Sequence, residues 1–190
     1  MSKKINLLFT HTGTYFSEIL AAFSKAKYNH VSICIDEDMD HFYSFGRRVV
    51  RFPLLSGFVT ERLNHGIYKI YKDTVACIYS LEITEEQYEG LKETLNNYEK
   101  HKYRYGYNLI GLLGIIVNKP IKRRKKFFCS QFVALLLIQN SIFNFKKDYC
   151  LVKPEDIEEM PNLMKIFEGK LSDFKKDSTD YQHLDYTVNY

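Results

Sequence analysis

The spacing of hydrophobic residues along the chain changes from a period of two to a period near 3.6, which predicts strands followed by helices. Over 30–36, apolar residues at 31, 33 and 35 alternate with polar or small residues at 30, 32 and 34. This is the pattern of a half-buried strand with two different faces. An acidic turn leads to a second strand, His41–Phe45, and the two segments are expected to form a β-hairpin. Two more strands are predicted at 67–71 and 75–83, with an edge strand at 163–167, and residues 5–10 form a short apolar run that ends in a turn.

Helical spacing occurs at 15–25 and again in the second half of the chain. Thr84 and Gln87 form a capping box that opens a helix to about Tyr98. We expect 107–117 to be a short helix buried in the core, and 127–139, apolar almost all round, to be buried on most sides. A last short helix is predicted at 154–160, whereas 47–66 is expected to be irregular.

Together these elements predict one α+β domain over residues 1–169, followed by a polar tail at 170–190 that is expected to fray. A length of 190 residues suits a single domain, and 45% hydrophobic with 26% charged residues exclude a wholly disordered chain. The longest apolar runs fall short of the ~20 residues that a transmembrane segment needs. With no secretory signal recognised, a cytoplasmic location and free thiols at the four cysteines are expected.

Cys129 is the residue that most suggests chemistry. It stands at the start of the strongly apolar helix, where backbone N–H groups and the helix dipole favour a thiolate. The run Lys119–Lys126, with six basic residues among eight, adds positive potential just before it. A cysteine nucleophile also needs a base, and His30, on the polar face of its strand, is the natural one. Two alternatives stay open: Cys129 as an inert packing residue and His30 as a structural histidine.

Two stretches carry a resemblance to a known family. Tyr28-Asn29-His30-Val31-Ser32-Ile33 and Phe127-Phe128-Cys129-Ser130-Gln131-Phe132-Val133 resemble the histidine and cysteine motifs of the circularly permuted branch of the NlpC/P60 superfamily. That branch comprises papain-like cysteine hydrolases such as the YiiX/YebB-like proteins, with the lecithin:retinol acyltransferase group as relatives. The likeness covers residues 5–168. It implies a permuted papain-like fold, with an antiparallel sheet packed on a helix that starts at the nucleophilic cysteine.

The resemblance assigns Cys129 as the nucleophile and His30 as the general base. The family's third, polar member usually lies on the strand after the histidine, as a Glu or a His. By position, that place falls on Ser44 in this chain. A serine can orient an imidazole by a hydrogen bond but cannot stabilise imidazolium by charge, so Ser44 departs from the family pattern.

Other side chains could complete the site. His41 or Glu61 could take the third place in space, although Glu61 could equally form a salt bridge with an arginine such as Arg47. Gln131, within the cysteine motif, is a further supporting or substrate-binding candidate. The sequence does not choose among them.

The predicted function is that of a thiol-dependent hydrolase, an amidase or peptidase, or of an acyltransferase. It would act on a peptide- or acyl-amide-like substrate through an acyl-enzyme and would need no metal or organic cofactor. Peptidoglycan-type peptides are the first candidate substrate, with intracellular peptides, isopeptides or lipid amides beside them. Because the acidic third residue is missing, a non-catalytic binding module on the same scaffold is the alternative.

The basic run Lys119–Lys126 allows a third function, an adaptor for a membrane surface or a nucleic acid. No nucleic-acid-binding signature accompanies the run, so nucleic acid is not expected and a solvated loop is preferred. In a hydrolase, Lys122, Arg123 and Arg124 could instead attract an anionic substrate. The neighbouring segment 107–117 lacks a charged face of its own, which favours the core over a membrane surface.

Overall fold

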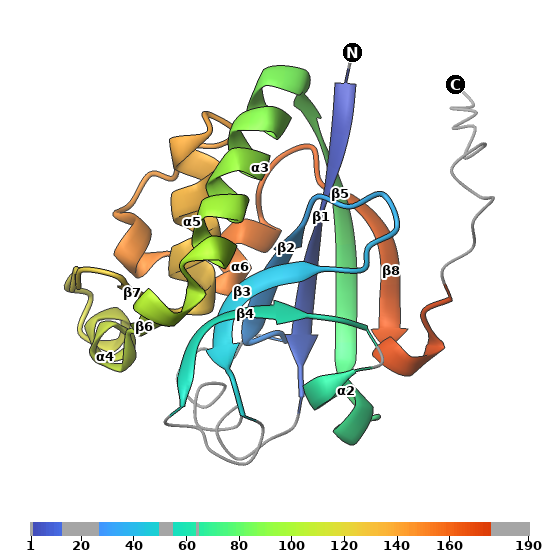
Figure 1. Ribbon diagram of the computed structural model, residues 1–190, viewed down its shortest axis with the longest axis horizontal. Coiled ribbons are helices and arrows are strands. Elements are labelled where there is room, and N and C mark those ends of the chain that lie inside the picture. The colour runs from blue at the N-terminus through green and yellow to red at the C-terminus, as the bar shows by residue number, and fades with distance from the viewer. Residues whose placement is uncertain (1, 13–26, 50–54, 64, 176–190) are drawn as a thin grey trace, which may run out of the picture.

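The computed structural model describes residues 2–12, 27–49, 55–63 and 65–175, which form an α+β fold (Figure 1). Its strands are β1 (Ser2–His11), β2 (His30–Cys34), β3 (Phe42–Arg47), β4 (Ser56–Glu61), β5 (Val75–Thr84), β6 (Gly106–Tyr107), β7 (Lys126–Phe127) and β8 (Met164–Lys170). Within the described residues they form one sheet in the order β7-β6-β4-β3-β2-β1-β5-β8. All neighbouring strands are antiparallel except β6 and β7, which run parallel, so the sheet is mixed.

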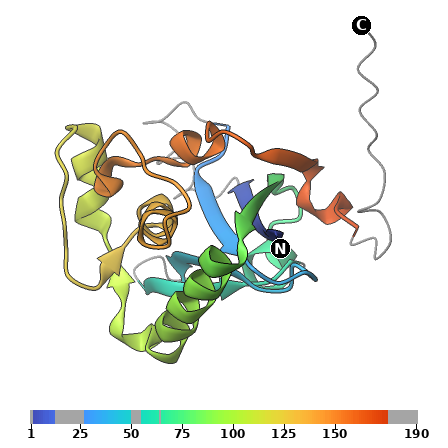
Figure 2. The same ribbon diagram turned by 90° about the horizontal axis from the view of Figure 1, so that it is seen from above.

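Helices lie mainly on one side of this sheet (Figures 1 and 2). The α-helices of the described residues are α2 (Gly66–Ile70), α3 (Glu85–Lys100), α4 (Leu109–Ile116), α5 (Cys129–Gln139) and α6 (Pro154–Glu158). Short 3-10 turns are η1 (Lys102–Arg104), η2 (Tyr149–Leu151) and η3 (Leu171–Asp173). No helix in these ranges is both long and apolar enough to cross a membrane.

The sheet separates two hydrophobic cores. Phe9, Ile33 and Phe132 belong to the larger one, where α5 packs against β2 and β3 and α3 packs against β1 and β5. Leu8 and Leu171 belong to the smaller core on the opposite face, which α2 and η3 help to cover. Because neighbouring residues of a strand point to opposite faces, the continuous apolar run of β1 serves both cores.

Several predicted elements are confirmed. β2 and β3 pair as an antiparallel hairpin with Ile33 opposite Tyr43. The capping box of α3 is present, since Thr84 Oγ1 accepts from the Gln87 N–H and Gln87 Oε1 accepts from the Thr84 N–H. β8 lies at the edge of the sheet beside β5. The helix predicted at 15–25 lies outside the described residues.

Other predictions are wrong. The segment predicted as a strand at 67–71 is largely helix α2, and the segment expected to be irregular at 47–66 contains β4. The predicted core helix at 107–117 is the surface helix α4, in which only Gly111 and Gly114 are buried. The polar tail does not begin at 170, because Leu171 is buried against Leu8 and its neighbours in the smaller core.

Candidate active site

One end of the sheet carries a cleft of about 570 Å³. β2 begins at this end and β3 finishes there, because the two strands are antiparallel. The paired strands β6 and β7 bring Tyr107 and the N-terminus of α5 to the same place. His30, Glu61, Tyr107 and Cys129, from four separate elements, all line the cleft.

The His30 side chain forms a close pair with Glu61. Its Nε2 lies 2.8 Å from Glu61 Oε1, and the two side chains are only 20% and 12% exposed. An ionised carboxylate can only accept a hydrogen bond, so Nε2 is the ring nitrogen that carries a proton. That leaves Nδ1 as the nitrogen available to a second partner. Glu61 is the last residue of β4, a strand that the sequence does not predict.

The second carboxylate oxygen of Glu61, Oε2, also has a hydrogen-bond partner. The Tyr68 hydroxyl donates to Glu61 Oε2 at 2.9 Å, and Thr10 Oγ1 lies 3.5 Å from the same hydroxyl. Ser32 adjoins the carboxylate and helps to lower its pKa, although its Oγ has no partner with full hydrogen-bond geometry among the described residues. Glu61 is thus oriented from more than one side, which fixes the carboxylate that faces His30.

The pair keeps both groups charged. Burial alone would lower the pKa of His30, but the Glu61 carboxylate and hydrogen bonds to Cys129 and Glu61 raise that pKa well above its ordinary value. Burial alone would raise the pKa of Glu61, and the charge of His30 with hydrogen bonds from His30 and Tyr68 lowers it. Each partner therefore favours the ionised form of the other, as expected for a hydrogen-bonded pair in a site of low dielectric.

Cys129 is the first residue of α5 and is 5% exposed. Its thiol is one of the neighbouring groups that raise the pKa of His30. The backbone N–H groups in the first turn of a helix have no acceptor within the helix, so α5 offers hydrogen-bond donors at the end where Cys129 lies. The structure thus brings together the cysteine and histidine predicted from the sequence, with Glu61 behind the histidine.

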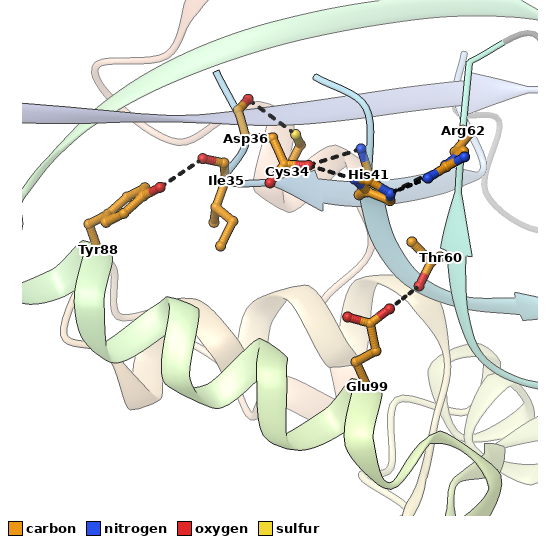
Figure 3. Close-up of polar contacts among 8 residues, drawn as sticks. All are labelled: Cys34, Ile35, Asp36, His41, Thr60, Arg62, Tyr88 and Glu99. Atoms are coloured by element: carbon orange, nitrogen blue, oxygen red, sulfur yellow. Dashed lines mark hydrogen bonds and ion pairs between the residues drawn. The ribbon is translucent and has the colours of Figure 1, made fainter. Parts of the chain in front are cut away.

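Ser44 and His41 are not the partners of His30. The Ser44 hydroxyl is fully buried and donates to the Val31 carbonyl at 2.7 Å. His41 lies between Asp36, whose Oδ2 is 2.9 Å from Nδ1, and Arg62, whose Nη2 is 2.6 Å from Nε2 (Figure 3). The place that the resemblance gave to Ser44 is therefore occupied in space by Glu61.

Gln131 lies two residues after Cys129 in α5 and is not among the residues that line the cleft. Its buried side chain accepts from Asn108 Nδ2 at 3.2 Å and from the Phe128 N–H at 3.4 Å, and donates to Cys150 Sγ at 3.1 Å. These contacts join the start of α5 to the N-cap of α4 and to η2. Gln131 therefore supports the position of Cys129 from within the protein.

Positive charge surrounds the cleft, but it comes from residues other than those expected. Lys122, Arg123 and Arg124 do not line it, and Lys122 forms an ion pair with Asp148 at 3.0 Å. The permanent cations among the described lining residues are Arg47, Arg48, Arg62 and Lys102, and Glu61 is the carboxylate among them. Since Glu61 is paired with His30, these four cations leave the cleft with an excess of positive charge.

Arg48 also builds the wall of the cleft. Its Nη2 donates to the carbonyls of Lys102 and Tyr105, each at 2.6 Å, which ties the end of β3 to η1. Gly57, opposite Gly106 in the β4–β6 pairing, leaves room for this guanidinium, because a Cβ there would lie 2.5 Å from Arg48 Nη2.

Two tyrosines of the site were not identified from the sequence. Tyr68 lies in the segment that was predicted as a strand, and Tyr107 at the start of a predicted core helix. Tyr107 is half-buried, and burial followed by the charge of Cys129 raises its pKa well above the ordinary value. Their only sequence signal was the high number of tyrosines, 15 in the chain, which does not single out any one of them.

Comparison with known proteins adds no relative to these observations. The chain matches no protein-family model, no curated protein and no solved structure.

Proposed function

We propose that the protein is a thiol-dependent hydrolase or acyltransferase, with Cys129 as nucleophile, His30 as general base and acid, and Glu61 as the residue that orients and charges His30. The observation that carries the proposal is the His30–Glu61 pair at 2.8 Å in a cleft that Cys129 also lines. A nucleophile beside a base, with the base held by a third group, is the arrangement that activates a cysteine. The order of His30 and Cys129 along the chain also fits a permuted papain-like fold.

The reaction begins from the ion pair of a Cys129 thiolate and a His30 imidazolium, in which the proton on His30 Nδ1 is the one that the thiol has lost. The thiolate attacks the carbonyl carbon of an amide or ester, and its new C–S bond forms as the carbonyl π electrons move to oxygen. When the C–N or C–O bond breaks, the imidazolium gives its proton to the leaving group and a thioester remains on Cys129. Glu61 stabilises the imidazolium throughout.

The second half of the reaction returns the enzyme. His30 removes a proton from water, or from another acceptor, as its oxygen or nitrogen attacks the thioester carbonyl. The C–S bond then breaks and Cys129 recovers a proton from the imidazolium. Donors for the oxyanion of both tetrahedral intermediates are the Cys129 N–H, at the start of α5, and the Tyr107 hydroxyl, which lines the same cleft.

The charge of the cleft supports a substrate that carries a carboxylate or phosphate near the scissile carbonyl. Arg47, Arg62 and Lys102 line the cleft from three separate segments of the chain, so an acidic acyl or peptide chain would meet positive charge on several sides. This proposal replaces Lys122, Arg123 and Arg124 as the anion-attracting residues.

A non-catalytic binding module was suggested by the lack of an acidic third residue on the strand of Ser44. Glu61 removes that reason, because its carboxylate is hydrogen-bonded to the His30 imidazole. Catalysis is therefore the function that the geometry supports best.

The proposal can be tested without knowing the natural substrate. The full chain is incubated with p-nitrophenyl acetate, and the acyl-enzyme is located by peptide mass spectrometry. We expect acetylation at Cys129 with release of p-nitrophenol, its loss in Cys129→Ala, and a decrease of roughly 10²–10⁴-fold in rate for His30→Ala. Acetylation spread over surface lysines, with equal rates in all three proteins, would contradict the proposal.

Substrate charge is tested with two peptidyl p-nitroanilides that differ only in Glu or Gln next to the scissile amide. We expect the Glu substrate to be cleaved with the lower KM, and this preference to shrink in Arg47→Gln. Equal KM values for the two substrates would remove the anionic substrate from the proposal and leave the chemistry of Cys129 untouched.

A further inference from the structure

Helix α4 presents an apolar face to solvent. The side chains of Leu109, Ile110, Leu113, Ile116 and the following Val117 are 42–61% exposed. Their positions follow the i, i+1, i+4, i+7, i+8 spacing, so they share one side of the helix. In both views the helix lies at the periphery of the molecule, outside β6 and β7 (Figures 1 and 2). An exposed continuous patch of large aliphatic side chains is typical of an interaction surface.

This orientation is built into the packing of the helix. Gly111 and Gly114 form the buried side of α4. A Cβ on Gly114 would lie 2.5 Å from the Lys119 carbonyl oxygen, and one on Gly111 would lie 2.3 Å from Asn108 Nδ2. Glycines therefore let the helix approach its own N-cap and the following loop closely, and the large side chains must point outward.

The loop that contacts Gly114 is the basic run of the sequence. Asn118, two residues after the end of α4, is in the left-handed region at a φ of 51°, and the Lys119 N–H donates to the Gly114 carbonyl at 2.9 Å. The Ile121 carbonyl accepts from Asn108 Nδ2 at 3.1 Å, which ties this loop to the N-cap as well. The segment 119–126 is thus held beside α4, and among its basic residues only Lys122 forms an ion pair within the described chain.

We propose that α4 and the basic loop 119–126 form a surface that docks on an anionic lipid bilayer. A helix with exposed aliphatic residues lies in the plane of such an interface, and neighbouring lysines and arginines add attraction to acidic headgroups. The surface adjoins the cleft, since Tyr107 directly precedes the N-cap of α4 and Cys129 follows β7. The proposal does not depend on the chemistry of Cys129.

Charge decides between a bilayer and other occupants. A two-fold dimer through α4 would place the same surface of each copy against the other, so the two basic loops would repel. A nucleic acid would satisfy the basic loop but would leave the five aliphatic side chains in contact with polar phosphates. An anionic bilayer is the partner that satisfies both parts of the surface.

Vesicle flotation of the full chain tests the proposal. We expect binding to phosphatidylcholine vesicles that contain phosphatidylglycerol, weakened by added salt, and little binding to phosphatidylcholine alone. Leu113→Ser with Val117→Ser should reduce partitioning about tenfold or more. Lys119→Gln with Arg124→Gln and Lys125→Gln should reduce it roughly 100-fold.

Matched controls lie elsewhere on the surface. Ile70 is 60% exposed, like Leu113, and Ile70→Ser should leave partitioning unchanged. Lys69→Gln with Lys72→Gln and Lys100→Gln removes the same charge from other exposed sites and should have a much smaller effect than the change in the basic loop.

Three outcomes would overturn the proposal. One is equal binding to vesicles by the wild type and both α4-loop variants. Another is dimerisation in sedimentation velocity that Leu113→Ser with Val117→Ser abolishes, without vesicle binding by the wild type. The last is binding of a fluorescent single-stranded oligonucleotide, lost only in the basic-loop variant, with no vesicle binding.

Discussion

At the scale of single residues, the chemistry of the cleft depends on how Glu61 is held. Its two carboxylate oxygens have different partners. Oε1 forms the hydrogen bond with His30 Nε2, and Oε2 accepts a hydrogen bond from the Tyr68 hydroxyl. This leaves His30 Nδ1 for Cys129 and fixes the plane of the imidazole. Removing one partner of a buried ion pair typically costs about 3–5 kcal/mol, so the three residues are expected to depend strongly on one another.

Tyr68→Phe tests this dependence. The change removes one hydrogen bond from Glu61 and keeps the aromatic ring, so we expect the free energy of unfolding to fall by about 1–3 kcal/mol. The pKa of Glu61 should rise as well, since the Tyr68 hydroxyl is one of the groups that lower it. Urea unfolding measures the first effect. Tyr103→Phe, at a residue 82% exposed, is the control and should change stability little; equal losses in the two variants would contradict the role of Tyr68.

How far the site could be predicted also differs from residue to residue. His30 and Cys129 each have a local signature, one on the polar face of an alternating strand and the other at the start of an apolar helix. Glu61 has no local signature, because it reaches His30 only through the pairing of β4 with β3, and no pattern in the sequence predicts that pairing. Ser44 was chosen by position along the chain, whereas its hydroxyl faces the Val31 carbonyl.

At the scale of elements, the predictions succeeded where a segment is long and strongly patterned. β5, α3 and α5 are of this kind, and their buried faces match their apolar spacing. β4 is short and contains Gly57, so it lacks the alternation that identifies a strand. α4 was placed in the core on hydrophobicity alone, but its two glycines rather than its large side chains make the close contact.

Gly114→Ala tests the packing of α4. The new methyl group would lie 2.5 Å from the backbone oxygen of Lys119. A backbone oxygen, unlike a flexible side chain, cannot rotate away from this contact. We expect thermal or urea unfolding to show a loss of about 1–3 kcal/mol.

Gly90→Ala in α3 is the matched control. Its Cβ would meet the Asn140 side chain at 2.9 Å, and that side chain can move. Alanine also favours a helix over glycine by about 1 kcal/mol, so this variant should be neutral or stabilised. If Gly114→Ala were as well tolerated as Gly90→Ala, the close glycine contact would not be what orients α4.

At the scale of the whole molecule, the His30–Glu61 pair makes stability depend on pH. The pKa of His30 is raised above 6.5, so its contribution is fully present below that pH and is lost as pH rises through the folded-state value. The pKa of Glu61 is lowered below 4.5, so its contribution is present above that pH and is lost as pH falls through the folded-state value. The pair is therefore most stabilising between about pH 4.5 and 6.5.

Glu61→Gln isolates this contribution. We expect the difference in the free energy of unfolding between wild type and variant to be largest at pH 5–6 and to shrink toward higher and lower pH. Urea unfolding at a series of pH values measures this difference. Contributions from surface ion pairs that both proteins share cancel when the two free energies are subtracted. A difference that stays constant with pH would mean that the pair is not ionised in the folded protein.

The central claim is that His30 and Cys129 act as one unit, and the pH dependence of Cys129 alkylation tests it most directly. Iodoacetamide is applied at a series of pH values, and the modified cysteine is located by mass spectrometry in the wild type, His30→Ala and the control Ser44→Ala. Burial raises the pKa of Cys77 and Cys150, so these two thiols should stay unmodified and serve as internal references.

We predict that Cys129 reacts well below pH 8.5, about the ordinary pKa of a free thiol. His30→Ala should remove this reactivity at low pH, and Ser44→Ala should keep it. A Cys129 that reacts only near the pH of a free thiol, or that reacts identically with and without His30, would contradict the claim and leave the cleft as a binding site.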